Sequence, residues 1–179
     1  MPTIYLSPSI QPYNKYLTEG DEQYWMNRIA DDMVPMLEQN GINVVRNTPN
    51  TSLGQAIRES NAGNYDLHLA LHSNAGPSNL AGKLRGPDVY YYPYSASGKR
   101  AAELIADELR KIYPDPDLVS TVATTRLAEI TKTSAPAVLV EIAYHDNAED
   151  EAWIKNNITV IAEALTHAVC AYLEMNCAL

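Results

Sequence analysis

The sequence predicts a single α/β domain, with a twisted, mostly parallel sheet and helices on both of its faces. Strand-like and helix-like segments alternate along the whole chain, which is the pattern of layered α/β proteins. The apolar run over 137–142 contains only one carboxylate, as expected of a buried central strand. The length of 179 residues suits one domain with a hydrophobic core.

The first half of the chain predicts three strands and two helices. Apolar residues recur at three- and four-residue steps in the first helix. Pro35 should kink this helix, and Asn40-Gly41 should end it, because glycine tolerates the left-handed conformation needed there. A hydroxyl of Thr51 or Ser52 should start the second helix. The expected elements are strand 4–6, helix 21–39, strand 42–46, helix 51–61 and strand 67–72.

The second half predicts two further strands and three helices. Pro114 should end the first of these helices. The stretch 118–130 has the least clear pattern, and we expect a strand and a loop there. The expected elements are strand 89–92, helix 95–113, strand 137–142, helix 149–155 and helix 159–173.

Charge and hydropathy exclude several classes of partner. The formal net charge of −9 argues against a broad basic patch for nucleic acid or anionic lipid. No apolar stretch approaches the length that spans a bilayer, and the N-terminus lacks the pattern of a signal peptide. We therefore expect no nucleic-acid or membrane partner. The chain is either kept in the cytoplasm, released by another agent, or part of a longer exported protein; its oligomeric state is left open.

Both cysteines, Cys170 and Cys177, fall in a segment that reads as a helix. Seven residues along a helix separate them by roughly 10 Å, which is too far for a disulfide. We expect small buried hydrophobic residues rather than a redox or metal site.

Two residues are unusual for buried strands. His72 ends an apolar strand, and Glu141 follows the apolar residues 137–140. In open α/β sheets, ligands bind beyond the carboxyl ends of the strands, so both residues point to one end of the sheet. A carboxylate on a buried strand is costly unless it is paired or bound to metal. The alternatives are a structural carboxylate and a hydrogen-bonded core histidine.

Other polar residues have simpler interpretations. Four residues along a strand span roughly 13 Å, so His68 could not share an ion with His72, and we expect it to be a partly exposed strand residue. Glu19, Asp21 and Glu22 cluster where the first helix begins, where carboxylates complement the helix dipole. His145 and His167 have no spacing that indicates metal binding.

Three motifs in order resemble the zinc-dependent N-acetylmuramoyl-L-alanine amidases of sporulation, cell division and phage endolysins. Residues 66–75, Asp-Leu-His-Leu-Ala-Leu-His-Ser-Asn-Ala, are similar to the family's strand that ends in a zinc-binding His. Residues 136–150 resemble the segment that carries the catalytic Glu. Glu22, with Asn27 and Ile29-Ala30, resembles the helix that begins with a zinc-binding Glu. The resemblance runs from Ile4 to about Leu173, and we assign 1–175 to the catalytic domain and 176–179 to a C-terminal tail.

The resemblance implies a zinc-dependent hydrolase of peptidoglycan that acts at the bacterial cell wall. Its implied zinc ligands are Glu22 and His72, and its implied catalytic base is Glu141. One motif departs from the family: Ser7-Pro8-Ser9-Ile10-Gln11 replaces Asp-Pro-Gly-His-Gly, whose His is the first zinc ligand. Gln11 is the nearest oxygen donor and becomes the candidate third ligand, although a neutral amide binds zinc more weakly than imidazole.

Two alternatives remain beside the amidase. The departure at Gln11 favours a peptidoglycan-binding or regulatory module of the same fold that has lost hydrolysis. A metallopeptidase with a peptide substrate is the third possibility. The presence of Glu22, His72 and Glu141 together favours an enzyme.

Overall fold

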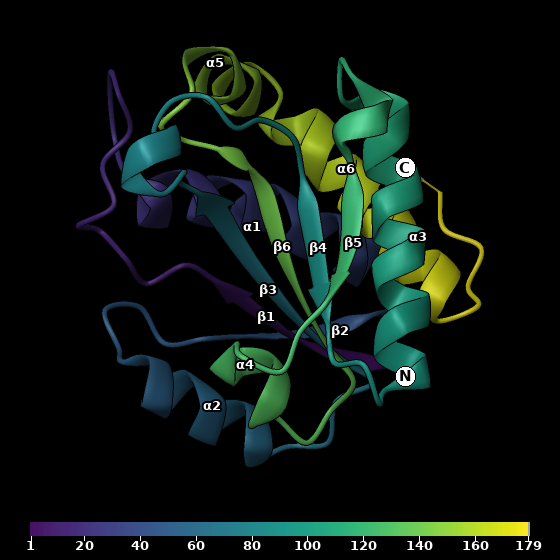
Figure 1. Ribbon diagram of the computed structural model, residues 1–179. Coiled ribbons are helices and arrows are strands. Elements are labelled where there is room, and N and C mark those ends of the chain that lie inside the picture. Colours follow the sequence, from purple (N-terminus) through teal and green to yellow (C-terminus); the bar gives the residue numbers. More distant parts are fainter. Residues whose placement is uncertain (179) are drawn as a thin grey trace.

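Six strands form one sheet in the order β2-β1-β3-β6-β4-β5 in the computed structural model, which describes residues 1–178 (Figure 1). They are β1 (Thr3–Pro8), β2 (Asn43–Arg46), β3 (Leu67–Asn74), β4 (Asp88–Tyr91), β5 (Ser120–Ala123) and β6 (Ala137–Tyr144). β2, β1, β3 and β6 are parallel, whereas β4 is antiparallel to β6 and parallel to β5. The predicted fold class, a mostly parallel α/β sheet, is confirmed.

Residues 1–178 also form six α-helices, four of them between strands and two after β6, and most begin or end at the predicted signals. They are α1 (Glu22–Gln39), α2 (Leu53–Asn61), α3 (Ala96–Ile112), α4 (Ala128–Thr131), α5 (Ala148–Asn156) and α6 (Ile158–Tyr172). The Ser52 side chain, not that of Thr51, accepts the first hydrogen bond of α2. α1 continues through Pro35 and ends before Gly41, whose φ of 76° suits glycine. No helix within residues 1–178 is long and apolar enough to cross a membrane.

The stretch 118–130 contains more structure than the predicted strand and loop. A turn of 3-10 helix (Pro116–Leu118) leads into the edge strand β5, and the chain then forms the single-turn helix α4. α4 is too short to show a helical period in the sequence. It packs against β6 and carries Glu129 into the interior.

The two faces of the sheet differ in their cover. One face presents Leu67, Leu69 and Leu71 to the main hydrophobic core, which includes residues of α1, α3 and α6. The short helices α2 and α4 lie by the other face, at the lower left of Figure 1. There, alternate residues such as His68 and Ala70 face outward from the main core. Buried polar residues such as Ser7 and His68 therefore lie on the α2/α4 face.

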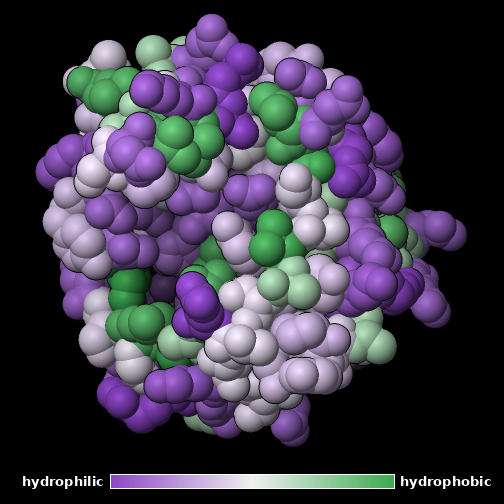
Figure 2. All heavy atoms as spheres, in the orientation of Figure 1, coloured by the Kyte–Doolittle hydropathy of each residue, from purple (hydrophilic) through white to green (hydrophobic). Residues whose placement is uncertain are grey.

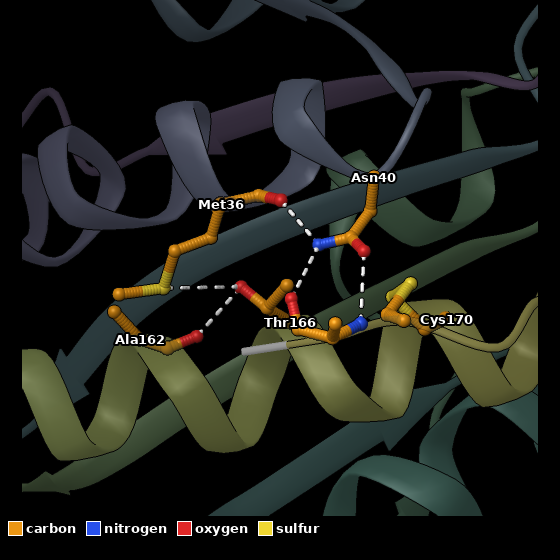
Figure 3. Close-up of a disulfide and its surroundings, with 7 residues drawn as sticks. Met36, Asn40, Ala162, Thr166 and Cys170 are labelled. Atoms are coloured by element: carbon orange, nitrogen blue, oxygen red, sulfur yellow. Dashed lines mark hydrogen bonds between the residues drawn. A yellow bond between two sulfur atoms is a disulfide. The ribbon is translucent and has the colours of Figure 1, made fainter.

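The expectation for the cysteines was wrong, because Cys170 and Cys177 form a disulfide with Cα atoms 6.0 Å apart (Figure 3). α6 ends at Tyr172, and the chain turns at Glu174, whose φ is 58°. The two cysteines are thus not on one continuous helix. The backbone of Ala178 exchanges hydrogen bonds with the Asn40 side chain. The segment expected as a tail, 176–179, therefore lies along α1 and α6 as far as residue 178, while residue 179 lies outside the described part.

Candidate active site

His72 and Glu141 lie side by side on neighbouring parallel strands. They are register partners of β3 and β6, so both side chains are on the same face of the sheet. The register shifts just after His72, an irregularity that is common next to active sites. Both residues line a cavity of about 450 Å³ on the α2/α4 face. Figure 2 shows a hollow on this side of the molecule, with hydrophobic side chains at its border.

The walls of the cavity come from four parts of the chain. The end of β1 and the following loop form one wall, the start of α2 a second, α4 a third and the sheet the floor. Both hydroxyl groups and apolar side chains line these walls. The wall residues include Ser9, Gln11, Ser52, Leu53, Leu127 and Leu139.

Glu22 reaches this site from the first turn of α1. It is 1% exposed, and its Oε1 lies 2.8 Å from His72 Nδ1. Asn14 donates a hydrogen bond to its Oε2 at 2.6 Å. Burial raises the pKa of Glu22, but the hydrogen bonds from His72 and Asn14 outweigh it and hold the pKa below its usual value. Asp21, its neighbour in the predicted acidic cluster, caps the helix instead.

Gln11 lies at the same point. Its Nε2 is 3.3 Å from His72 Nδ1, and its Oε1 accepts hydrogen bonds from the Asn14 amide and the Tyr13 hydroxyl. The amide comes from the loop after β1, the carboxylate from α1 and the imidazole from β3. The structure therefore brings Gln11, Glu22 and His72 together around one imidazole nitrogen.

Glu129 belongs to the site but has no counterpart in the sequence prediction. Its Oε2 lies 3.0 Å from His72 Nε2, and its Oε1 lies 3.3 Å from His68 Nε2. Ser7 donates a hydrogen bond to the same Oε1 at 2.5 Å. The only sequence signal was a Glu between apolar residues in the stretch without clear pattern. A three-dimensional arrangement was needed to find it.

The prediction that His68 is partly exposed was wrong, since its side chain is fully buried. Its Nδ1 lies 2.8 Å from the hydroxyl of Ser60 on α2, and its ring stacks on Tyr5. α2 covers this part of the sheet, so a strand residue that alternates with leucines is shielded from water on both faces. His68 and His72 contact opposite oxygens of Glu129.

Both nitrogens of His72 therefore face carboxylates. Burial lowers the pKa of His72, but the hydrogen bonds to Glu129 and Glu22 outweigh it and hold the pKa well above its usual value. Burial likewise raises the pKa of Glu129, and its hydrogen bonds with His68 and His72 outweigh that effect and lower the pKa. The two carboxylates on either side of the ring therefore favour the protonated form of His72.

Some of the side chains around His72 are suited to bind a metal ion, and others are not. Across residues 1–178, no three His, Cys, Asp or Glu side chains are grouped so that they could hold one ion. Glu22 and Glu129 cannot share one, because they face opposite nitrogens of His72. Glu22 and His72 Nδ1 are ligand types that zinc prefers, and the Gln11 amide is the third polar group beside them.

Glu141 differs from the other carboxylates because it lacks a partner. Its Oε2 is shut off from solvent and makes no hydrogen bond within the described part of the chain. Burial raises the pKa of Glu141 to about 7; the charges of Glu22 and Asp88 act in the same direction, and that of His72 opposes them. A carboxyl group with a pKa near neutrality can accept and return a proton, which is what a general base must do.

The remaining histidines lie outside this cavity. His145 is buried and contacts the hydroxyl of Ser73 at 2.9 Å, while Tyr16 stacks on its ring. His167 is on the exposed side of α6. Neither lines the cavity that holds His72 and Glu141.

Several solved structures share this fold. The amidase AmiC2 of Nostoc punctiforme superposes with a TM-score of 0.82 at 22% identity, covering 97% of each chain. The catalytic domain of the amidase CwlV from Bacillus (Paenibacillus) polymyxa var. colistinus gives 0.84 at 19% identity, covering 98% of this chain and all of that one. The catalytic domain of the endolysin CD27L, which targets Clostridia difficile, gives 0.74 at 23% identity over 99% and 100% of the two chains.

Sequence comparisons give the family. An uncharacterised protein of Clostridium perfringens is 27% identical over 135 residues, which make up 73% of this chain and 40% of that protein. The family model described as N-acetylmuramoyl-L-alanine amidase matches residues 15–171. The match begins after Gln11, within the loop between β1 and α1, and it includes Glu22, His72 and Glu141. This chain therefore belongs to the N-acetylmuramoyl-L-alanine amidase family.

Proposed function

We propose that this chain is a peptidoglycan hydrolase that cuts the amide bond between the lactyl group of N-acetylmuramic acid and L-alanine at the bacterial cell wall. One observation carries the proposal. His72 and an unpaired carboxylate with a pKa near 7, Glu141, line a single cavity, and Glu22 lies 2.8 Å from His72 Nδ1, in a chain of the amidase family. The disulfide supports action outside the cytoplasm, because disulfides persist in oxidising surroundings.

Glu22 and His72 would hold a zinc ion, with Gln11 as the third ligand. Zinc bound in this way lowers the pKa of water and polarises a carbonyl group. Glu22 is prepared for this role, because burial and the Asn14 amide fix its carboxylate before any ligand arrives. His72 Nδ1 faces the same point, so a cation there would take the place of the Nδ1 proton.

Glu141 would act as the general base and then as the general acid. Its side chain lines the cavity, and its Oε2 makes no hydrogen bond with another described residue. It would accept a proton from the attacking water and pass it to the nitrogen of the leaving L-alanine. A pKa near the working pH makes both transfers feasible for one group.

The substitution of Gln11 for the family's first His favours one other function. In that case the cavity would bind peptidoglycan without cutting it, because the amide would hold zinc too weakly. The two functions differ in what the chain releases from cell walls.

The test uses purified peptidoglycan incubated with the zinc-loaded chain. The amidase proposal requires new N-terminal L-alanine without new reducing sugar ends, and loss of this release after chelation of the metal. Glu141→Gln serves as the matched inactive control. Binding to the wall without release of L-alanine would contradict hydrolysis and favour the binding module. Release of a different amino terminus would point to a peptidase.

A further inference from the structure

Glu129 joins the two histidines of β3 through its two oxygens. We propose that Glu129 is a positioning residue, which fixes the ring of His72 so that Nδ1 faces Glu22 and Gln11. The metal-binding consequence rests on the proposed function, whereas the fixed orientation of the ring does not.

The two ring nitrogens of His72 have different partners: Nε2 contacts the positioning carboxylate, and Nδ1 contacts the proposed zinc ligands. Nε2 faces Glu129 at 3.0 Å, and Nδ1 faces Glu22 at 2.8 Å with Gln11 at 3.3 Å. An imidazole that donates from Nε2 to a carboxylate is held in the tautomer whose Nδ1 is the ligand atom. A rotation of the ring would break both contacts at once.

Glu129 is itself held in place from several directions. It is 5% exposed and sits on α4, the single turn that packs against β6. The hydroxyl of Ser7 and Nε2 of His68 both contact its Oε1. His68 is anchored in turn by Ser60 of α2. Oε2 is therefore directed at His72 by contacts that do not involve His72.

A purely structural role for Glu129 would require only its contact with His68 and not the contact with His72. Pairing His68 with Oε1 would satisfy the buried histidine, and Oε2 could then point to any donor. Instead, Oε2 contacts the one imidazole whose other nitrogen lies between Glu22 and Gln11. Loss of such an outer partner of a metal-binding histidine typically weakens metal affinity by about 10- to 100-fold.

The first experiment measures zinc affinity by competition with a chelator. Glu129→Ala should weaken binding by roughly 10- to 100-fold. Glu129→Gln should weaken it less, because an amide oxygen still accepts from Nε2. Asp150→Asn is the matched control: Asp150 is equally buried and accepts hydrogen bonds from Gly86, Tyr113 and Tyr144, but does not touch His72. Unchanged affinity in Glu129→Ala, or an equal loss in Asp150→Asn, would overturn the proposal.

The second experiment needs no metal. In ¹⁵N-labelled metal-free protein, the Nε2 proton of His72 should be protected from exchange with water and give an observable resonance. That resonance should remain in Glu129→Gln and Asp150→Asn and disappear in Glu129→Ala; if Glu129→Ala does not fold, the Gln variant carries the test through a shifted resonance. Its absence from the parent, or no change in either Glu129 variant, would contradict positioning. If the resonance behaves as expected but the parent binds no zinc, the metal proposal fails and the positioning of His72 stands.

Discussion

The two faces of the sheet are built from the same strands but serve different purposes. On the face covered by α1, α3 and α6, Leu71 and Val140 are fully buried among other apolar side chains. On the α2/α4 face, the neighbouring positions carry His72 and Glu141, and a cavity remains open. Long helices close the first face, whereas a nine-residue helix and a single turn only partly cover the second.

This difference shows how a small domain separates stability from chemistry. Because successive residues of a strand point to opposite faces, one strand can supply both the core and the site. The buried carboxylates and histidines of the second face cost stability unless they are paired. All but Glu141 are paired within the site. Substitutions on the two faces should therefore have different effects: those in the main core should lower stability, and those at the site should lower activity or zinc affinity.

The largest effect is expected from Glu141→Gln. The change is nearly isosteric, but an amide cannot accept the proton of the attacking water. Hydrolysis of purified peptidoglycan should fall by about 100- to 10,000-fold, with zinc content unchanged. A variant that cuts the wall at close to the parental rate would show that Glu141 is not the base.

The same variant should lose activity without losing stability in the metal-free chain. The pKa of Glu141 is raised in the folded state from 4.5 to about 7, so the folded protein binds more protons between these values than the unfolded chain. Its contribution to stability therefore falls as the pH rises through this window. At pH 8, Glu141→Gln should unfold at a temperature equal to or above that of the parent. Clear destabilisation would instead indicate a structural carboxylate.

Truncation of a core leucine should separate the two faces in stability. Leu69→Ala removes a fully buried side chain from the main core and should cost about 2–5 kcal/mol in the free energy of unfolding. Leu53→Ala removes a side chain that is 46% exposed at the cavity wall, and should cost less than about 0.5 kcal/mol. Urea unfolding would measure both, and equal losses would contradict the division between the faces.

The disulfide between Cys170, on α6, and Cys177 lies on the face that supplies stability. Cys177→Ala opens the loop between Cys170 and the C-terminal segment, and should reduce stability by about 2 kcal/mol. Hydrolysis by the folded protein should not change, because neither cysteine lines the cavity. Reductant should destabilise the parent by a similar amount and leave Cys177→Ala unaffected. A parent that is insensitive to reductant would argue against the disulfide.

The smallest effect concerns the third ligand. The Gln11 amide nitrogen lies 3.3 Å from His72 Nδ1. Gln11→His replaces this neutral amide by an imidazole and should tighten zinc binding by about tenfold, or about 1.4 kcal/mol. Tyr13→His is the matched control, because Tyr13 borders the same cavity and is 73% exposed. Equal tightening in both variants, or none in Gln11→His, would place Gln11 outside the ligand set.

The sequence predicts well those features that depend on local pattern. The alternation around Leu69 and the apolar run before Glu141 located two central strands, and His72 at the end of the expected strand 67–72 indicated where polar residues would meet. Motif order then indicated the family. The strand and helix predictions depend on periods of two or about four residues, which are visible within a short window.

The remaining features depend on contacts between distant parts of the chain. His68 is buried because α2 covers it, and Glu129 enters the site from a single turn of helix with no period of its own. Cys170 and Cys177 meet because the chain reverses after α6. No residue spacing in the sequence indicates that the chain reverses after α6 or that α2 packs over His68. These features become visible only in the three-dimensional structure.

The location of a zinc ion tests the central claim most directly. Crystals grown with zinc, measured at the zinc absorption edge, should give one strong anomalous peak bonded to Glu22 and His72 on the α2/α4 face. Such a peak would show that zinc binds beside Glu141, as the proposed hydrolysis requires. A zinc-loaded crystal whose metal contacts neither Glu22 nor His72 would contradict the account.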